Sequence, residues 1–252
     1  MLIILIIGGA SQTIANQCIK SHDAIIRGDT SQQELALVFT GGDYSDGGEF
    51  ITKALNRFGI QAGFFFTGGF YRDSSNRDLI FDLIKAGHYL GPHSDQHLLY
   101  CSWENRDSLL VTRKEFKADL INNYRIMGRF GIEKSAASYF IPPYEWYNRK
   151  IVKWAKAMEV TVFNFTPGTL SHADYTTPRM KNYRSSEVIY SSIMTYEKEA
   201  ENGLNGFILL IHIGSSPERE DKFYYYLDEL IPALRRRGYK FVRIDKLLKT
   251  CN

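Results

Sequence analysis

The sequence has no apolar run long enough to cross a membrane, little excess of charge and only three cysteines. A net charge of +3 is too small to indicate a nucleic-acid partner. Two glycine pairs, at 41–42 and 68–69, lack the spacing of a phosphate-binding loop, so no nucleotide or flavin site is expected. With 44% hydrophobic and 23% charged residues, the chain is of ordinary globular composition and long enough to fold without a disulfide scaffold.

The cysteines give little functional information. Cys18, Cys101 and Cys251 are far apart and show no metal-ligand spacing. An odd number excludes a fully paired intrachain set. We expect them to be isolated rather than catalytic.

Residues 1–33 are predicted to form a leader and a linker. The apolar run 2–7 and the small residues after it resemble the core and cleavage region of a signal peptide, although the usual basic start is missing. The run is too short to span a bilayer, and its alternative interpretation is a buried first strand. We favour export, to the periplasm, the cell surface or the medium, and place one catalytic domain at 34–252. The sequence does not indicate an oligomeric state.

Strand-like and helix-like segments alternate from residue 35 onwards. The run 35–40 is typical of a buried strand, and 48–58 has helical spacing that ends at Gly59. Similar pairs of a strand-like and a helix-like segment recur along the chain, up to a last strand at 240–244. This alternation predicts βαβ units and a mostly parallel sheet. We expect an α/β fold, an irregular (β/α) barrel of about seven strands, with reactive residues at the carboxyl ends of the strands.

Two histidines follow one of these strand ends. His93 and His97 are four residues apart, and on a helical turn that spacing brings both rings to one face. Imidazole suits zinc and other borderline cations. The same spacing also arises by chance, so the pair alone does not establish a metal site.

Two carboxylates follow the first strong strand. Asp43 and Asp46 lie in the glycine-rich segment 41–48, where they can supply an oxygen ligand and a general base. Ser45 or Asp46 can instead cap the following helix, which would make one carboxylate structural.

Other candidates lie near later strand ends. His212 ends an apolar strand, where it is either a hydrogen-bonded core residue or a general acid. Tyr144, Trp146 and Tyr147 are suited either to stacking against sugar rings or to packing at the mouth of the barrel.

In this order, the motifs resemble those of the polysaccharide deacetylases, carbohydrate esterase family 4. The segment 93–97 matches the family's His-Ser/Thr-x-x-His motif, and 62–68 resembles its Phe-rich strand. The segment 142–144 matches part of an Arg-Pro-Pro-Tyr motif, and the strand ending at His212 is similar to a Leu-x-His motif. Asp174-Tyr175 more weakly resembles an Asp-Trp wall. The resemblance covers roughly residues 35–248.

The resemblance implies a hydrolase that removes acetyl groups from N-acetylated, or O-acetylated, polysaccharide or oligosaccharide. It implies one divalent metal ion, zinc in preference to cobalt or nickel, held by His93, His97 and a carboxylate. We assign the carboxylate ligand to Asp46, the general base to Asp43 and the general acid to His212. Four residues are expected to contact the substrate: Pro143, Tyr144, Glu145 and Trp146.

The sequence departs from the family where the first strand ends. The segment 39–42, Phe-Thr-Gly-Gly, stands in place of Phe-Asp-Asp-Gly, and Ile141 replaces the arginine that orients the base. Asp43 and Asp46 lie a few residues later, and only sequence order distinguishes their roles, which are exchangeable. Two alternatives therefore stay open: an inactive carbohydrate-binding protein on the same fold, and an esterase for O-acetyl groups. The histidines favour hydrolysis, because a binding groove needs none of them.

Overall fold

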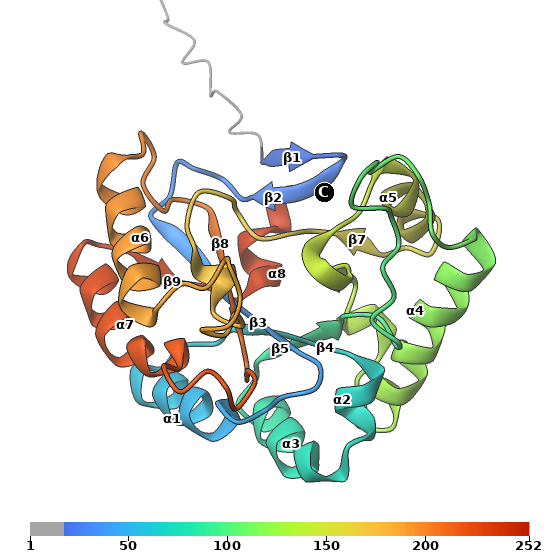
Figure 1. Cartoon of the computed structure of the whole chain (residues 1–252), viewed down its shortest axis with the longest axis horizontal. Coiled ribbons are helices and arrows are strands. Elements are labelled where there is room, and N and C mark those ends of the chain that lie inside the picture. Colours follow the sequence, from blue (N-terminus) through green and yellow to red (C-terminus); the bar gives the residue numbers. More distant parts are fainter. Residues whose placement is uncertain (1–17, 252) are drawn as a thin grey trace, which may run out of the picture.

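The computed structural model describes residues 18–251 (Figure 1). The strands are β1 (Ile19–Ser21), β2 (Ala24–Arg27), β3 (Glu34–Gly41), β4 (Gly63–Phe66), β5 (Tyr89–Pro92), β6 (Tyr139–Phe140), β7 (Thr161–Val162), β8 (Phe207–His212) and β9 (Lys240–Phe241). The helices are α1 (Gly48–Phe58), α2 (Gly68–Arg72), α3 (Arg77–Lys85), α4 (Arg113–Gly128), α5 (Arg149–Lys156), α6 (Ser186–Glu199), α7 (Leu227–Arg236) and α8 (Ile244–Leu247). Figure 1 shows β3, β4 and β8 in the middle, with all helices except α8 around them. Within the described residues, no helix has the length and apolarity that a membrane span requires.

A parallel sheet of five strands forms the centre. Its order is β5-β4-β3-β8, and β9 pairs with the start of β3. The strands β6 and β7 form a separate parallel pair, and β1 and β2 an antiparallel one. The predicted α/β fold with a parallel sheet is confirmed. The strand ladders of residues 18–251 form these three separate groups, and single backbone hydrogen bonds link them: the N–H of Asn164, after β7, donates to Ile25 of β2, and that of Thr166 donates to Ile208 of β8.

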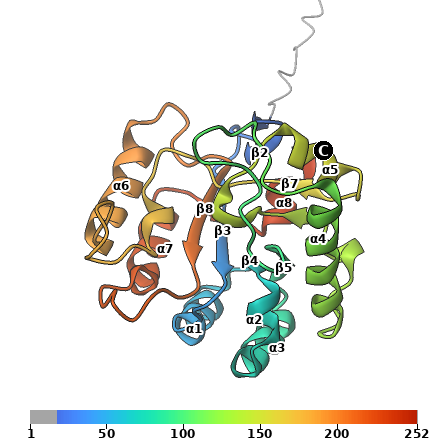
Figure 2. The ribbon, with the colours of Figure 1, turned by 45° about the vertical axis from the view of Figure 1, so that its right-hand side comes forward.

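Alternate residues of β3 pack into two different cores. Leu37 and Phe39 belong to the core that lies against α1, α3, α6 and α7. Ala36 and Val38 face the opposite way, into a core shared with the inner residues of β8. Thr40 of β3 pairs with His212 of β8, which runs beside it in Figure 2. By the same alternation both side chains lie on this second, inner face.

Several element boundaries agree with the prediction. Helix α1 begins and ends as its apolar spacing predicted, and Gly59, with φ 60°, adopts the left-handed conformation that ends it. Helix α6 begins after Ser185, whose side chain accepts a hydrogen bond from the N–H of Val188.

The segment 18–33, predicted as part of a linker, is instead packed onto the domain. It contains β1 and β2, and Ala24 and Ile25 are buried. A disulfide joins Cys18 to Cys251, so the expectation of isolated cysteines is wrong for two of the three; Cys101 is buried and free. The error arose because no spacing pattern indicates a bond across 233 positions. The predicted signal peptide lies outside the described residues.

Candidate active site

His93 and His97 follow β5 in a loop rather than on a helical turn. Ser94 has φ 77° and His97 has φ 52°, so the backbone cannot continue as a right-handed helix. The two rings nevertheless lie together, with their centroids 5.0 Å apart.

The neighbours of His93 fix which of its ring nitrogens carries the proton. Its Nδ1 lies 2.8 Å from the carbonyl oxygen of Ile141. A carbonyl only accepts hydrogen bonds, so Nδ1 carries the hydrogen and Nε2 keeps its lone pair. Metal-binding histidines are commonly oriented in this way. Burial lowers the pKa of His93 well below its usual value, and a proton on the neighbouring His97 would lower it further, so the ring is neutral.

The loop between the histidines is held by a buried carboxylate of α4. Asp119 accepts hydrogen bonds from the N–H groups of Asp95 (3.2 Å) and Gln96 (2.9 Å) and from the hydroxyl of Tyr100 (2.6 Å). At the end of this loop, burial lowers the pKa of His97 to about 4, and the charge of His212 acts in the same direction. His97 is therefore also neutral near pH 7.

Glu145 reaches the histidines from the segment that follows β6. Its Oε1 lies 4.0 Å from Nε2 of His93 and has no hydrogen-bond partner among the described residues. Burial raises the pKa of Glu145 to about 7, against the opposing effect of His212. Tyr144 and Glu145 have φ values of 58° and 52°. Non-glycine residues held in this conformation cost about 1–3 kcal/mol each and cluster at functional sites.

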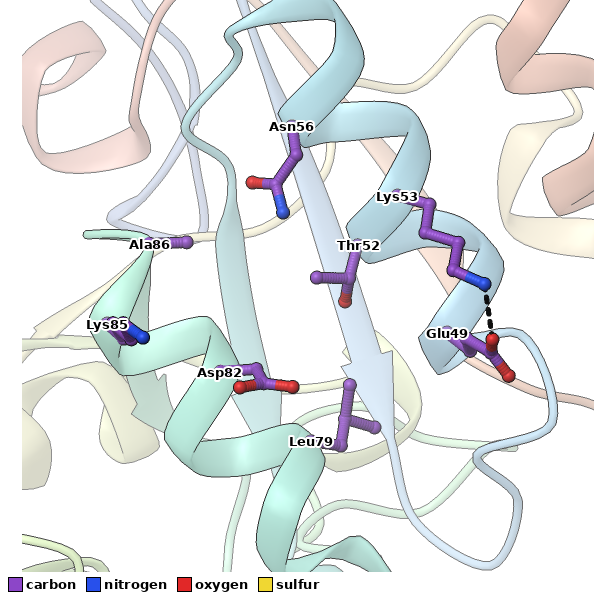
Figure 3. Close-up of a pocket in the computed structure, with 8 residues that line it drawn as sticks. All are labelled: Glu49, Thr52, Lys53, Asn56, Leu79, Asp82, Lys85 and Ala86. Atoms are coloured by element: carbon purple, nitrogen blue, oxygen red, sulfur yellow. Dashed lines mark hydrogen bonds and ion pairs between the residues drawn. The ribbon is translucent and has the colours of Figure 1, made fainter.

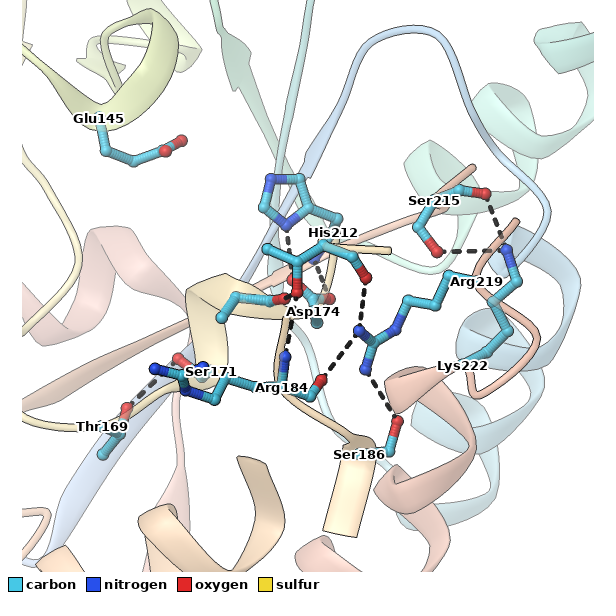
Figure 4. A network of polar contacts seen from close by, with 12 residues as sticks. Glu145, Thr169, Ser171, Asp174, Arg184, Ser186, His212, Ser215, Arg219 and Lys222 are labelled. Carbon is cyan, nitrogen blue, oxygen red and sulfur yellow. Dashed lines mark hydrogen bonds and ion pairs between the residues drawn. The ribbon is translucent and has the colours of Figure 1, made fainter. Parts of the chain in front are cut away.

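His212 is oriented by Asp174 (Figure 4). Its Nδ1 lies 2.6 Å from one oxygen of Asp174, and its backbone N–H donates to the other at 2.8 Å. Burial alone would lower the pKa of His212, but the charge and hydrogen bond of Asp174, with the charge of Glu145, raise it overall. The site therefore holds a histidine that favours the protonated form beside two neutral ones.

The segment that carries Asp174 is braced by a fully buried arginine (Figure 4). Arg219 donates to the carbonyl oxygens of Thr176 (2.7 Å) and Arg184 (3.0 Å) and to the hydroxyl of Ser186 (3.2 Å). These bonds tie both ends of the segment to the region after β8.

The structure distinguishes the two predicted aspartates. The carboxylate of Asp46 accepts from the N–H of Ser215 (2.9 Å) and the hydroxyl of Tyr224 (3.0 Å), and pairs with Nζ of Lys222 (3.0 Å). These contacts draw Asp46 into a network of its own rather than toward the histidines. Asp43 is exposed, and its negative charge opposes the lowering of the pKa of His97 by burial, so it lies within electrostatic range of the site.

Aromatic side chains border the histidines on one side. The ring of Tyr144 lies 4.3 Å from that of His97 and is 45% exposed. Trp103, 53% exposed, lies 5.8 Å from Tyr144 and 5.2 Å from Trp146. The guanidinium of Arg106 covers Trp146 at 3.5 Å. This exposed aromatic surface is suited to sugar rings.

Two residues predicted for this surface face inward. Pro143 is buried, and the buried Tyr147 donates its hydroxyl to the carbonyl oxygen of Ser21. Tyr147 therefore packs in the core, which was the alternative interpretation of the aromatic cluster.

A separate hollow lies between α1 and α3 and contains no predicted site residue (Figure 3). Its lining residues are Glu49, Thr52, Lys53, Asn56, Leu79, Asp82, Lys85 and Ala86. The ion pair of Lys53 and Glu49 across one turn of α1 is solvent-exposed. Exposed pairs of this kind have little chemical or energetic effect, so this hollow is not the candidate site.

Among residues 18–251, no three His, Cys, Asp or Glu side chains already stand in a geometry that holds a metal ion. The available donors nevertheless fit a divalent cation. The neutral rings of His93 and His97 lie 5.0 Å apart, and the unpaired, buried Oε1 of Glu145 lies 4.0 Å from Nε2 of His93. Nitrogen and carboxylate donors in this combination are typical of catalytic zinc sites.

Comparison with known proteins identifies the family. A family model described as polysaccharide deacetylase matches residues 27–163, more than half of the chain. The chain belongs to the polysaccharide deacetylase family. This confirms the family predicted from the motifs, with its hydrolytic activity on acetylated carbohydrate and its general dependence on a metal ion.

Relatives of this polysaccharide deacetylase family chain include active and inactive proteins. It is 25% identical over 236 residues to the peptidoglycan-N-acetylmuramic acid deacetylase PdaA of Bacillus subtilis, covering 92% of this chain and 78% of that protein. The solved structure of PdaA superposes with a TM-score of 0.68 at 21% identity, covering 92% of this chain and 87% of that one. A family pseudoenzyme from Bacillus anthracis superposes with a TM-score of 0.67 at 19% identity, covering 91% and 70%. A mutant of that pseudoenzyme has restored enzymatic activity.

The prediction from sequence missed several residues that shape this site. Asp174 was noted only as part of a wall, yet it orients His212 from 38 positions away. Asp119 and Trp103 were not singled out. A buried carboxylate on a charged helix and one tryptophan in a loop carry no spacing signal, so only the fold identifies them.

Proposed function

We propose that this chain is an active deacetylase that hydrolyses the acetyl amide of an N-acetylated glycan with zinc as its metal. The observation that carries the proposal is the pairing of His212 with Asp174 beside the neutral pair His93 and His97. A sugar-binding groove has no need of a histidine held toward its protonated form by a buried carboxylate.

Each group has a role that follows from its surroundings. His93 and His97 are neutral and offer ring lone pairs to a cation. Such a metal ion, when bound, supplies Lewis acidity for the acetyl carbonyl and for the attacking water. Asp43 is exposed, and its negative charge acts on the pKa of His97. Asp43 accepts the proton of the water.

His212 completes the reaction. Its Nδ1–H donates to Asp174, so Nε2–H is free to protonate the nitrogen of the leaving amine. The water oxygen first bonds to the acetyl carbon, and the bond from that carbon to nitrogen breaks afterwards as the nitrogen takes the proton of His212, which yields acetate and an amino sugar. The exposed rings of Tyr144 and Trp103 stack against neighbouring sugar units.

Acetate release tests this activity directly. The substrates are N-acetylglucosamine oligomers, peptidoglycan fragments (because PdaA is named for peptidoglycan) and O-acetylated xylan. We expect zinc-loaded protein to release acetate from at least one N-acetylated substrate, and His212→Ala to reduce the rate by about 10²–10⁴-fold. Release from the O-acetylated substrate alone would identify an esterase instead.

One observation favours a second function, carbohydrate binding without catalysis. The end of β3 carries Thr40 and Gly41 where the family has two aspartates, and a structural neighbour is a pseudoenzyme. Metal content by mass spectrometry separates the two functions. About one zinc per chain, lost in a His93→Ala/His97→Ala double variant, supports the hydrolase. Sugar binding in a protein that takes up no metal supports the second function.

We also infer that the protein is exported. The disulfide between Cys18 and Cys251 supports this, because such bonds persist in oxidising compartments outside the cytoplasm. Cell fractionation with thiol labelling tests the inference. We expect the protein outside the cytoplasm, with only Cys101 as a free thiol; a fully reduced cytoplasmic pool would refute it.

A further inference from the structure

The second of the two positions at which the family carries carboxylates has no room for an acidic side chain in this chain. Gly41 ends β3, and a Cβ added there would lie 2.8 Å from Cγ2 of Ile213 and 2.8 Å from Cδ1 of Phe66. Both neighbours belong to the core on the helix side of the sheet. If this site binds a metal, its carboxylate must come from another segment.

Glu145 presents an unpaired carboxylate oxygen to the histidines. Its Oε1 is buried, has no partner among the described residues and lies 4.0 Å from Nε2 of His93. Because Nδ1 of His93 donates to Ile141, this Nε2 also carries a lone pair. When Glu145 is ionised, two acceptors therefore face each other in a buried space with no protein donor between them, an arrangement that a cation would stabilise.

The separation is slightly long for two ligands of one metal ion. With zinc bonds of about 2.0–2.2 Å and tetrahedral geometry, a ligand nitrogen and a ligand oxygen lie about 3.3–3.5 Å apart. The observed 4.0 Å between Nε2 and Oε1 therefore requires the carboxylate to move toward His93 by about half an ångström when the ion binds.

The backbone holds Glu145 in place at an energetic cost. Tyr144 and Glu145 both have left-handed φ values, and the side-chain amide of Asn164 donates to the carbonyl oxygen of Glu145 at 2.8 Å. The same short segment contributes the Ile141 carbonyl that orients His93. One segment thus sets both the direction of a histidine lone pair and the carboxylate opposite it.

We propose that Glu145 is the third protein ligand of the metal and replaces the carboxylate that the family places after its first strand. This inference rests on the proposed function, since it uses the metal held by His93 and His97. It leaves Asp43 free to act as the base.

Cobalt(II) titration of metal-free full-length protein tests the assignment, with visible absorption as the readout. We expect one cobalt per wild-type chain and a loss of affinity of at least about tenfold in Glu145→Gln. Glu197→Gln is the matched control. Its side chain is 14% exposed against 15% for Glu145, but it pairs with Arg237 elsewhere on the molecule. We expect this control and Asp43→Asn to keep the wild-type affinity.

Thermal unfolding of the same proteins excludes misfolding as the cause. Metal-free Glu145→Gln should be at least as stable as wild type, because the substitution removes a buried, unpaired carboxylate. Cobalt should raise the melting temperature of wild type more than that of the variant. Equal cobalt affinity in Glu145→Gln and wild type would overturn the assignment while leaving the proposed function intact. No cobalt binding by wild type would overturn both.

Discussion

The two glycines at the end of β3 offer a direct test of whether this site has been rebuilt. A Cβ at Gly41 would lie 2.8 Å from both Ile213 and Phe66, whereas a Cβ at Gly42 meets nothing closer than Cγ2 of Thr67 at 3.7 Å. Real Cβ atoms almost never approach other atoms within 3.0 Å, while 3.7 Å is an ordinary contact. Adjacent positions therefore differ sharply in the space that they offer.

Substitution at Gly41 should destabilise the fold. Overpacking of a filled core costs about 1–3 kcal/mol. At about 2–4 °C per kcal/mol for a chain of this size, Gly41→Ala should lower the melting temperature by about 2–12 °C. Gly41→Asp should lower it further, because it also buries a charge. Gly42→Ala and Gly42→Asp should stay within about 0.5 kcal/mol of wild type.

Differential scanning calorimetry and cobalt titration of the four variants provide the measurement. We expect Gly41→Asp to bind cobalt no more tightly than wild type, although it restores a family carboxylate. A Gly41→Asp protein that melts with wild type and binds cobalt more tightly would refute the reasoning. That result would mean that the site still has the family's space for a carboxylate at Gly41 and has lost only the side chain, rather than taking its carboxylate from another segment.

Three further changes test other parts of the molecule. Asp174→Asn removes the charge that raises the pKa of His212 against the effect of burial, so the alkaline limb of the activity profile should move to lower pH; an unshifted limb would argue against His212 as the acid. The stability that the His212–Asp174 pair contributes is present in full below the pKa of an unfolded histidine, about 6.5, and falls as pH rises through the raised pKa of the folded state. Denaturation measured at several pH values should show this trend in wild type and not in the variant. Cys18→Ser should lower the free energy of unfolding by about 2–5 kcal/mol because it opens a loop of 233 positions, and an unchanged denaturation midpoint would contradict this. Asp46→Asn should leave cobalt affinity at the wild-type value and cost at most about 1 kcal/mol, since its pairing with Lys222 is 39% exposed on the carboxylate side; weaker cobalt binding would return Asp46 to the metal site.

Much of the fold followed from local patterns. The strand at the centre of the sheet and the helices α1 and α6 are specified by apolar spacing and by residues at their ends, such as Gly59, which act within a few positions. The short strands β1 and β2 were missed because four or fewer residues give no periodicity. Their place depends on packing and on a distant cysteine.

The residues of the site likewise divide into those that local motifs predict and those that only the fold brings together. His93, His97 and His212 were found because each belongs to a motif of a few residues. The pairing of His212 with Asp174 and the approach of Glu145 to His93 depend on how loops from separate strands meet. Sequence order placed Asp46 near the metal, but Lys222 and Tyr224, which come from beyond β8, draw its carboxylate away.

The disulfide also changes the connectivity of the molecule. Because Cys18 and Cys251 lie at opposite ends of the described residues, the backbone from 18 to 251 and one sulfur–sulfur bond make a covalent ring. A single proteolytic cut in a surface loop opens this ring without releasing a fragment. A chain cut once therefore stays one covalent molecule until a reductant breaks the disulfide. The redox state of the surroundings thus decides whether a cut between Trp103 and the histidines on one side and the rest of the site on the other divides the chain into two molecules.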